Sequence, residues 1–193
     1  MPRQPRQTTP GIPLHIVQRG CNRQQVFHDE QDHVKYLSLL RTKSSHYKVS
    51  IHVWVFMSNH IHLLCTAEQS NAPSKMMQTL SIAYSNYYNK KYQRSGTLWQ
   101  GRYRSKQITH DSYLLCAYRY VELNPVRAGL VNHPSQYKWS SYNCNAFGKS
   151  DNLTTAHSIY DSLGNTKEQK QTNYQNLFQE ALNPKQIQSI RTT

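Results

Sequence analysis

The chain has 193 residues, a length that suits one domain with a short tail. It carries 23 Lys and Arg against 10 Asp and Glu, and the whole excess of +13 lies within residues 1–150. Such a basic footprint is typical of a protein that binds a polyanion, most often nucleic acid. The four cysteines are scattered and no apolar run approaches 18 residues, which argues against zinc fingers, disulfide frameworks and membrane spans. We expect a cytoplasmic protein.

The chain is expected to begin with a flexible basic and proline-rich arm over residues 1–13. A globular domain follows over 14–148, and a polar helical tail over 149–193. Hydrophobic patterning within the domain predicts the order β-α-β-β-α-β and then a further helix, at residues 14–18, 29–47, 49–56, 60–66, 73–91, 102–109 and from 111. This is the order of the ferredoxin-like or split βαβ fold, an α+β antiparallel sheet with helices packed on one face.

Residues 49–56 show the clearest strand pattern. Two sets of side chains alternate along them: Val49, Ile51, Val53 and Val55 against Ser50, His52, Trp54 and Phe56. Strict alternation predicts a regular strand that presents the two sets on opposite faces.

Two histidines that flank one apolar residue are the most informative feature of the chain. His60 and His62 lie in the next predicted strand, and residues two apart in a strand point to the same face. Their imidazoles are therefore placed to converge on one metal ion, while Ile61, Leu63 and Cys65 face the core. The alternative is that each histidine is a structural residue with its own hydrogen-bond partner.

The last predicted helix of the domain carries a second candidate group. Tyr120 and Asn124 are four residues apart and share one helix face. A tyrosine can act as a covalent nucleophile when its target is strongly polarised, as a metal ion would polarise a phosphate. Packing for Tyr120 and a capping role for Asn124, before Pro125, remain as alternatives.

Taken together, these motifs resemble the single-tyrosine HUH transposases, and among them the REP-associated tyrosine transposases. The resemblance covers residues 10 to 145 and is carried by the order and spacing of five segments: Gly11–Gly20, the histidine pair, Ser95–Tyr103, Tyr120–Val131 and Trp139–Tyr142. It implies that residues 14–148 form a catalytic domain, in a protein of bacterial type that is associated with the nucleoid.

The resemblance also implies a mechanism. His60 and His62 would bind one divalent ion, Mg²⁺ or Mn²⁺, and Asn124 falls where the family supplies a third polar ligand. Tyr120 would attack a DNA phosphorus, which gives a 5′-phosphotyrosine link and a free 3′-OH. The family acts on single-stranded DNA beside a folded hairpin, so the expected activity is that of a DNA endonuclease and strand transferase on REP-type palindromes.

A basic and aromatic stretch before the last helix is the expected DNA surface, because single strands are held by basic grooves with aromatic platforms. Together with two arginines that follow the first strand, the predicted contacts are Arg19, Arg23, Trp99, Arg102, Tyr103, Arg104 and Lys106. Each arginine has the alternative of being a solvated surface charge, and Trp99 of belonging to the core.

Three other functions compete with the transposase reading. A non-catalytic hairpin binder would lack a ligand or the nucleophile, and the chain has all of them. An RNA-binding ferredoxin-like module would need aromatic residues on adjacent central strands, for which Trp54 and Phe56 are the candidates. A different metal enzyme would leave Tyr120 dispensable. We expect a monomer, with a homodimer as the alternative.

Overall fold

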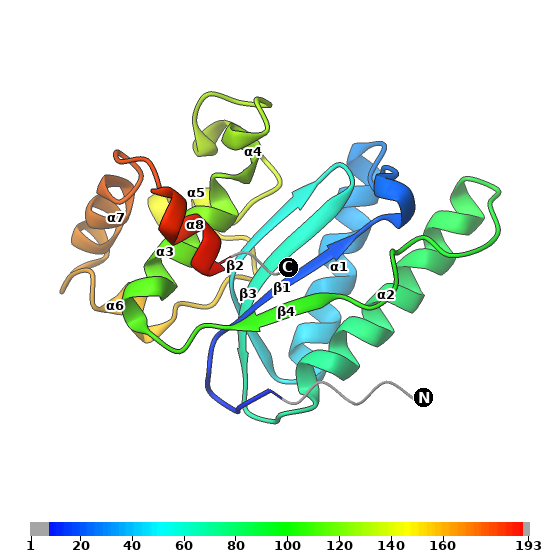
Figure 1. The fold of residues 1–193 in the computed structure, drawn as a ribbon, viewed down its shortest axis with the longest axis horizontal. Helices are drawn as coiled ribbons and strands as arrows, with labels where there is room; N and C mark the ends of the chain where they lie inside the picture. The colour runs from blue at the N-terminus through cyan, green and yellow to red at the C-terminus, as the bar shows by residue number, and fades with distance from the viewer. Residues whose placement is uncertain (1–7, 191–193) are drawn as a thin grey trace.

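A four-stranded antiparallel sheet forms the centre of the protein (Figure 1). The structure is a computed structural model and describes residues 8–190. The strands are β1 (Leu14–Arg19), β2 (Val49–Met57), β3 (His60–Ala67) and β4 (Arg104–Gln107), in the order β2-β3-β1-β4. Helices α1 (Glu30–His46) and α2 (Ala72–Lys91) make the two crossovers. This topology confirms the ferredoxin-like fold predicted from the sequence.

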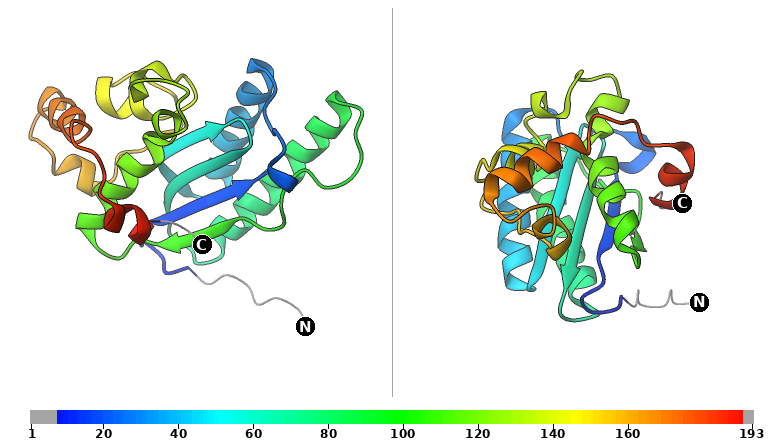
Figure 2. Two further views of the ribbon diagram at one scale, coloured as in Figure 1. Left: turned by 45° about the horizontal axis from the view of Figure 1, so that its top comes forward. Right: turned by 90° about the vertical axis from the view of Figure 1, so that its left-hand side faces the viewer.

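Helices lie against both faces of the sheet (Figure 2). The crossover helices α1 and α2 pack on one face, as predicted. Helix α3 (Asp111–Glu122) crosses the opposite face over β2 and β3, and the C-terminal helices gather around it. The second face is therefore only partly covered, and side chains of β1 and β3 reach a space bounded by α3.

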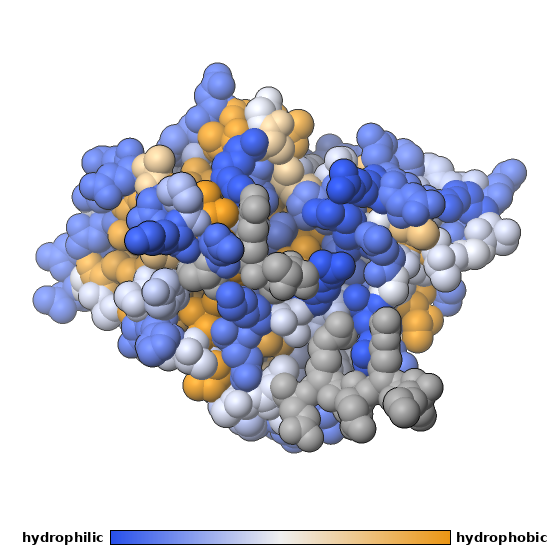
Figure 3. Space-filling model, viewed as in Figure 1, coloured by the Kyte–Doolittle hydropathy of each residue, from blue (hydrophilic) through white to orange (hydrophobic). Residues whose placement is uncertain are grey.

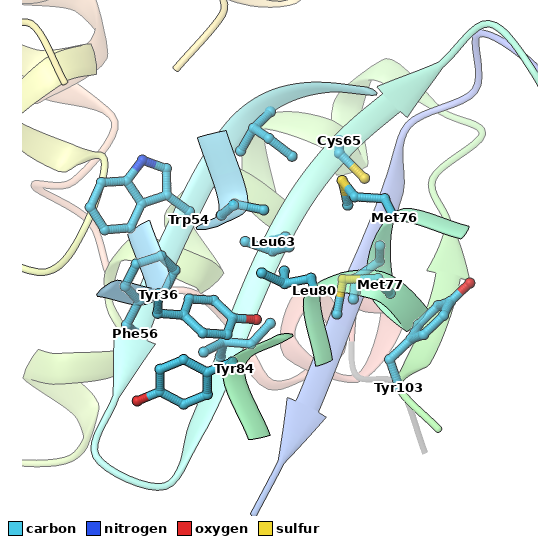
Figure 4. Packing of buried hydrophobic residues seen from close by; sticks show 14 of the residues in the cluster. Tyr36, Trp54, Phe56, Leu63, Cys65, Met76, Met77, Leu80, Tyr84 and Tyr103 are labelled. Carbon is cyan, nitrogen blue, oxygen red and sulfur yellow. The ribbon is translucent and has the colours of Figure 1, made fainter. Parts of the chain in front are cut away.

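The larger core lies between the sheet and the crossover helices (Figure 4). Tyr36 from α1 and Tyr84 from α2 meet edge to face, with ring centroids 4.9 Å apart, against Phe56 and Leu63 of the sheet. All four side chains are fully buried, and edge-to-face aromatic pairs of this kind add specific geometry to burial. This core holds β1 and β3 rigidly from behind.

The strand predicted over residues 49–56 is confirmed as β2, but a bulge interrupts its alternation. Ile51 pairs with Cys65 and Val53 with Leu64, so one extra residue, His52, interrupts the ladder. A bulge of this kind shifts every later side chain to the other face. Val53 and Val55 therefore pack toward α3, while Trp54 and Phe56 enter the core beneath α1 and α2; the residues before the bulge, Val49 and Ile51, also face that core.

The ends of α1 and α2 are joined by a polar cluster. Asp29 caps α1 by accepting a hydrogen bond from the Asp32 backbone N–H at 3.0 Å. The buried Asp32 carboxylate accepts from Lys91 Nζ at 2.8 Å and from the Tyr92 hydroxyl at 2.7 Å. These bonds outweigh burial and hold the pKa of Asp32 below its ordinary value. The cluster fixes the spacing of the two crossover helices.

A buried carboxylate ties the chain after the sheet to α3. Glu122 accepts hydrogen bonds from Ser141 Oγ and the Tyr174 hydroxyl, each at 2.6 Å, and from Asn145 Nδ2 at 3.1 Å. Burial raises the pKa of Glu122 to about 7, against the effect of these three donors.

The remaining helical segments among the described residues are η1 (Cys21–Arg23), α4 (Asn124–Arg127), η2 (Pro134–Gln136), α5 (Tyr142–Phe147), α6 (Ser158–Asp161), α7 (Lys167–Asn176) and α8 (Pro184–Ile190).

Both terminal segments contact the domain in the part that the structure describes. Thr8 Oγ1 donates to the Ser70 carbonyl at 2.6 Å, and the Gly11 N–H donates to the Ala67 carbonyl at 2.9 Å. Residues 1–7 of the predicted arm lie outside the described residues. The tail packs back on α3 through the buried Tyr174. Across residues 8–190 no helix has the length and apolar character needed to cross a membrane.

Candidate active site

The histidine pair lies on β3 with its side chains directed toward α3. Ile61, Leu63 and Cys65 pack into the core on the opposite face, as the alternation predicted. His62 is 4% exposed and His60 is partly buried, with ring centroids 5.0 Å apart. The two imidazoles are therefore close enough to approach one ion from neighbouring directions.

Hydrogen bonds determine which ring nitrogen of each histidine is available. His15, on β1, has Nδ1 3.1 Å from the Ile190 carbonyl and Nε2 2.9 Å from His62 Nδ1. Since a carbonyl only accepts, neutral His15 donates through Nδ1 and accepts through Nε2. His62 must then donate through Nδ1, which leaves its Nε2 with a lone pair.

The same logic applies to His60. Its Nδ1 lies 2.6 Å from Asn59 Oδ1, while Asn59 Nδ2 donates to the Arg23 carbonyl at 3.1 Å. Asn59 therefore accepts and His60 donates through Nδ1, so the Nε2 atom of His60 is also left with a lone pair. Both histidines are arranged as metal ligands usually are, with the second nitrogen held by a hydrogen bond.

The electrostatic surroundings keep these rings neutral. Burial lowers the pKa of His60 to about 4, and the positive charge of Arg19 adds to the effect. Burial also lowers the pKa of His62 well below its ordinary value, followed by the charges of His15, His60 and two arginines. Protons therefore compete weakly for the Nε2 atoms at neutral pH, as metal binding requires.

Tyr120 lies on α3 directly across from the histidines. Its ring centroid is 5.9 Å from that of His62 and 5.8 Å from that of His15, each in an edge-to-face arrangement. Tyr120 is 7% exposed, and the Arg127 guanidinium lies 4.9 Å from its ring centroid. The structure thus brings Tyr120 beside His62 and His15, which lie far from it in the chain.

Asn124 begins the short helix α4, immediately after α3 ends. Its Nδ2 donates to the Tyr120 carbonyl at 2.8 Å and to the Val121 carbonyl at 3.2 Å. The alternative that Asn124 caps the turn after it is not seen, because the N-cap of α4 is Leu123 and the Asn124 amide instead bonds back to the last turn of α3. Its Oδ1 atom remains as the oxygen that this residue can offer to a cation.

The donor set fits a divalent ion although it is small. Among residues 8–190, no three His, Cys, Asp or Glu side chains group as a metal site would require. The two imidazole Nε2 atoms are the protein donors that the contacts bring together, and the Asn124 amide lies at the end of α3, so phosphate oxygens and water would have to complete the shell. Such a site is expected to bind metal weakly until DNA is present.

A basic pocket opens beside the histidines. Its cavity volume is about 720 Å³, and its lining includes Arg19, Asn22, Arg23, Gln100, Arg102 and Arg104. No carboxylate is among the described residues that line it. Arg19 pairs with His60 across the β1–β3 ladder, so the pocket adjoins the histidine pair directly. Four of the seven predicted DNA contacts meet here, where strongly hydrophilic side chains gather over η1 and the loop before β4 (Figure 3).

The model of the family described as "Transposase IS200 like" matches residues 8–124. The chain belongs to the IS200-like transposases. A solved structure of a REP-associated tyrosine transposase, bound to a REP hairpin, has the same fold as this chain. The two align at a TM-score of 0.60, with 15% identity over 81% of this chain and 93% of that one. A transposase structure from Deinococcus radiodurans R1 aligns at a TM-score of 0.44, with 15% identity over 66% of this chain and 97% of that one. No curated protein matches the sequence.

The remaining predicted contacts of this transposase divide between two places. Lys106 pairs with His15 across the β1–β4 ladder and lies on the same face as the histidines. Trp99 and Tyr103 are 7% and 6% exposed and belong to the large core. Both rings therefore pack against the core with little exposed surface, and their expected role as a stacking platform for a base stays a prediction; the Tyr103 hydroxyl also bonds Ser74 Oγ at 2.8 Å.

Sequence reasoning missed His15 as a part of the site. The residue stands in the first strand of the transposase domain, among apolar residues, where one histidine gives no pattern. The signal that would have found it is face alternation, since Leu14 and Ile16 point to the core and His15 to the opposite face. Trp54 and Phe56, the aromatic residues required by the RNA-binding alternative, are buried on the edge strand β2.

Proposed function

We propose that this IS200-like transposase is a metal-dependent single-stranded DNA endonuclease and strand transferase with Tyr120 as its nucleophile. The observation that carries the proposal is the contact of Tyr120 with His62, which in turn packs beside His60, while the Nε2 atoms of both histidines keep their lone pairs. The ring centroids of Tyr120 and His62 are 5.9 Å apart. A tyrosine beside an imidazole that can bind a metal ion suits nucleophilic attack on a phosphate bound to that ion.

The residues of the chain divide the chemistry as follows. The Tyr120 hydroxyl oxygen attacks the phosphorus and the bond from phosphorus to the 3′ oxygen breaks. The phosphorus is then bonded to the Tyr120 oxygen and keeps its bond to the 5′ oxygen of the downstream strand. The phenol gives up its proton and the leaving 3′ oxygen takes one up. Reversal with a different 3′-OH rejoins strands. The Arg127 guanidinium, 4.9 Å from the Tyr120 ring centroid, stabilises negative charge on the phenolate and on the phosphate.

His60 and His62 would hold a divalent cation through Nε2, and Asn124 through Oδ1. Such a cation would polarise the scissile phosphate, which compensates for the weak nucleophilicity of a protonated phenol. Imidazole ligands favour Mn²⁺ over Mg²⁺, whereas phosphate and water oxygens accept either.

We further propose that the DNA is a hairpin with single-stranded flanks. The support is the fold shared with a transposase bound to a REP hairpin, together with the four-arginine pocket beside the histidines. A pocket of this charge suits the phosphates of an unpaired flank that leads to Tyr120. The protein would act as a monomer.

The test is a cleavage assay on end-labelled hairpin oligonucleotides taken from DNA that flanks the gene, with Mg²⁺ or Mn²⁺, on a denaturing gel. A metal-dependent covalent protein–DNA band is expected for the wild type, and its loss in Tyr120→Phe and His60→Ala. Tyr118→Phe is the matched control, because it removes a hydroxyl from the same helix outside the histidine cluster. Retarded DNA on a native gel, with no adduct under any metal, would favour a hairpin binder without catalysis.

A further inference from the structure

A second cavity lies on the other face of the sheet, between α2 and the loop before β4. Its volume is about 560 Å³, and its walls include Gln18, Met77, Ser81, Trp99, Arg102 and Tyr103. This volume is in the usual range for small-ligand sites, which combine apolar walls with a few fixed polar groups. Figure 4 shows two of the walls, Met77 and Tyr103, at the margin of the large core.

The polar groups of this cavity are placed by specific bonds. Gln18 is buried on the core-facing side of β1, where its Nε2 donates to Ser81 Oγ at 3.0 Å and its Oε1 accepts from Ser81 Oγ at 3.1 Å. A buried amide in an otherwise apolar face is costly unless such bonds satisfy it. Trp99 Nε1, also buried, has no hydrogen-bond partner among the described residues. The walls are thus apolar and aromatic, with hydrogen-bonding groups at fixed positions.

The cavity and the basic pocket are two sides of one sheet edge. Alternation along β1 sends Val17 and Arg19 to the basic pocket and Gln18 to the cavity. Strand β4 pairs with β1 only from Leu14 to Val17, so beyond that point the edge is closed by the loop, whose Gln100 N–H donates to the Arg19 carbonyl at 2.8 Å. Arg102 lines both spaces.

We propose that this cavity binds one unpaired nucleobase of the DNA strand whose phosphates occupy the basic pocket. The positive charge of the basic pocket favours a nucleic acid strand as the ligand. A strand held by its four arginines would reach Arg102, which also lines the cavity. A nucleobase combines flat apolar faces with a polar edge, which matches walls of Met77, Trp99 and Tyr103 beside the Gln18 amide. The proposal rests on the proposed DNA substrate but not on cleavage.

The test measures binding without chemistry. Fluorescence anisotropy in EDTA compares hairpins with intact single-stranded flanks against the same hairpins carrying one abasic nucleotide, moved along the flank. At one position, removal of the base is expected to weaken wild-type binding by about 5- to 150-fold, the range for loss of one stacked base. Equal affinities at all positions would overturn the proposal.

A cavity-filling variant gives the second half of the test. Gln78 is exposed on α2 and lines the cavity, so Gln78→Trp fills it without removing a core residue. The variant is expected to bind the intact flank as weakly as the wild type binds the abasic one, and to show no further loss on the abasic flank. Asn86→Trp, two turns further along the same helix and outside the cavity lining, is the matched control.

The outcomes separate this inference from the proposed function. An equal loss for intact and abasic flanks in Gln78→Trp would mean general damage and would reject a base in the cavity. A base effect that Gln78→Trp abolishes, in a protein that never forms the Tyr120 adduct, would support the cavity and reject catalysis. If Gln78→Trp were unfolded by circular dichroism, Ile82→Trp from the exposed rim serves in its place.

Discussion

His15 and His62 are joined by a hydrogen bond of 2.9 Å across the β1–β3 ladder, and their rings stack with centroids 5.2 Å apart. His62 is a candidate ligand, while His15 has both ring nitrogens engaged, with His62 and with the Ile190 carbonyl. His15 therefore acts on the site through His62, by fixing its tautomer and ring orientation, as hydrogen-bond partners of metal-binding histidines generally do.

Replacement of His15 by Ala is expected to weaken Mn²⁺ binding by about 10- to 100-fold, because His62 loses the acceptor that selects its Nδ1–H tautomer. The measurement is a titration of free Mn²⁺ by electron paramagnetic resonance in the absence of DNA, so that catalysis plays no part. His46→Ala, an exposed histidine of α1, should bind like the wild type. Unchanged Mn²⁺ affinity in His15→Ala would refute the positioning role.

Arg127 is exposed and approaches the ring of Tyr120, so its charge is available to the reaction more than to the fold. Arg127→Ala is expected to slow single-turnover cleavage by about tenfold or more, since a cation beside a developing negative charge stabilises the transition state. Arg127→Lys should recover part of the rate. Hairpin affinity, measured in EDTA, should change little; a fall in affinity that accounts for the whole rate loss would contradict this role.

The basic pocket predicts a particular salt dependence. Binding of a single strand weakens with rising salt in proportion to the phosphates neutralised, with about 0.7 in the logarithmic slope for each contact. Arg104→Gln should therefore reduce the magnitude of that slope by roughly this amount. Lys35→Gln, an exposed change of the same kind on α1 behind the sheet, should leave the slope unaltered. Equal slopes for both variants would remove the pocket from the DNA path.

Most of the fold follows from periodicity in the sequence. The β2–β3 hairpin and helices α1 and α2 lie within one residue of their predicted bounds, and α3 begins at its predicted start, because alternation and helical spacing continue through each element. The same periodicity does not predict the bulge at His52 in β2. The apolar residues Val53 and Val55 continue the alternation of Val49 and Ile51 without interruption, and only burial against α3 shows that they face the other way.

The site was predictable where its geometry is local. His60 and His62 share a face because they are two apart in a strand. That Tyr120 acts together with them was predicted from a resemblance to a known family. Contacts made between strands were not predictable: His15 meets His62 only through the β1–β3 register. Trp99 shows a second limit, since an aromatic residue in a basic loop is typical both of a stacking platform and of a core residue, and only the fold shows how its ring packs.

His52 also gives the protein an acid-sensitive contact. Its Nδ1 donates to the Thr155 carbonyl at 2.8 Å and its Nε2 lies 2.9 Å from Thr66 Oγ1, with His157 packed edge-to-face beside it. Burial lowers the pKa of His52 to about 4, so between its ordinary pKa of 6.5 and pH 4 the unfolded chain binds the proton that the folded state refuses. The contribution of His52 to the free energy of unfolding is complete above pH 6.5. It falls with decreasing pH, by about 3 kcal/mol in all.

In urea unfolding at a series of pH values, His52→Gln should lose this part of the pH dependence, and His46→Gln should keep it. Parallel wild-type and His52→Gln profiles would show that His52 does not remain neutral in the folded protein.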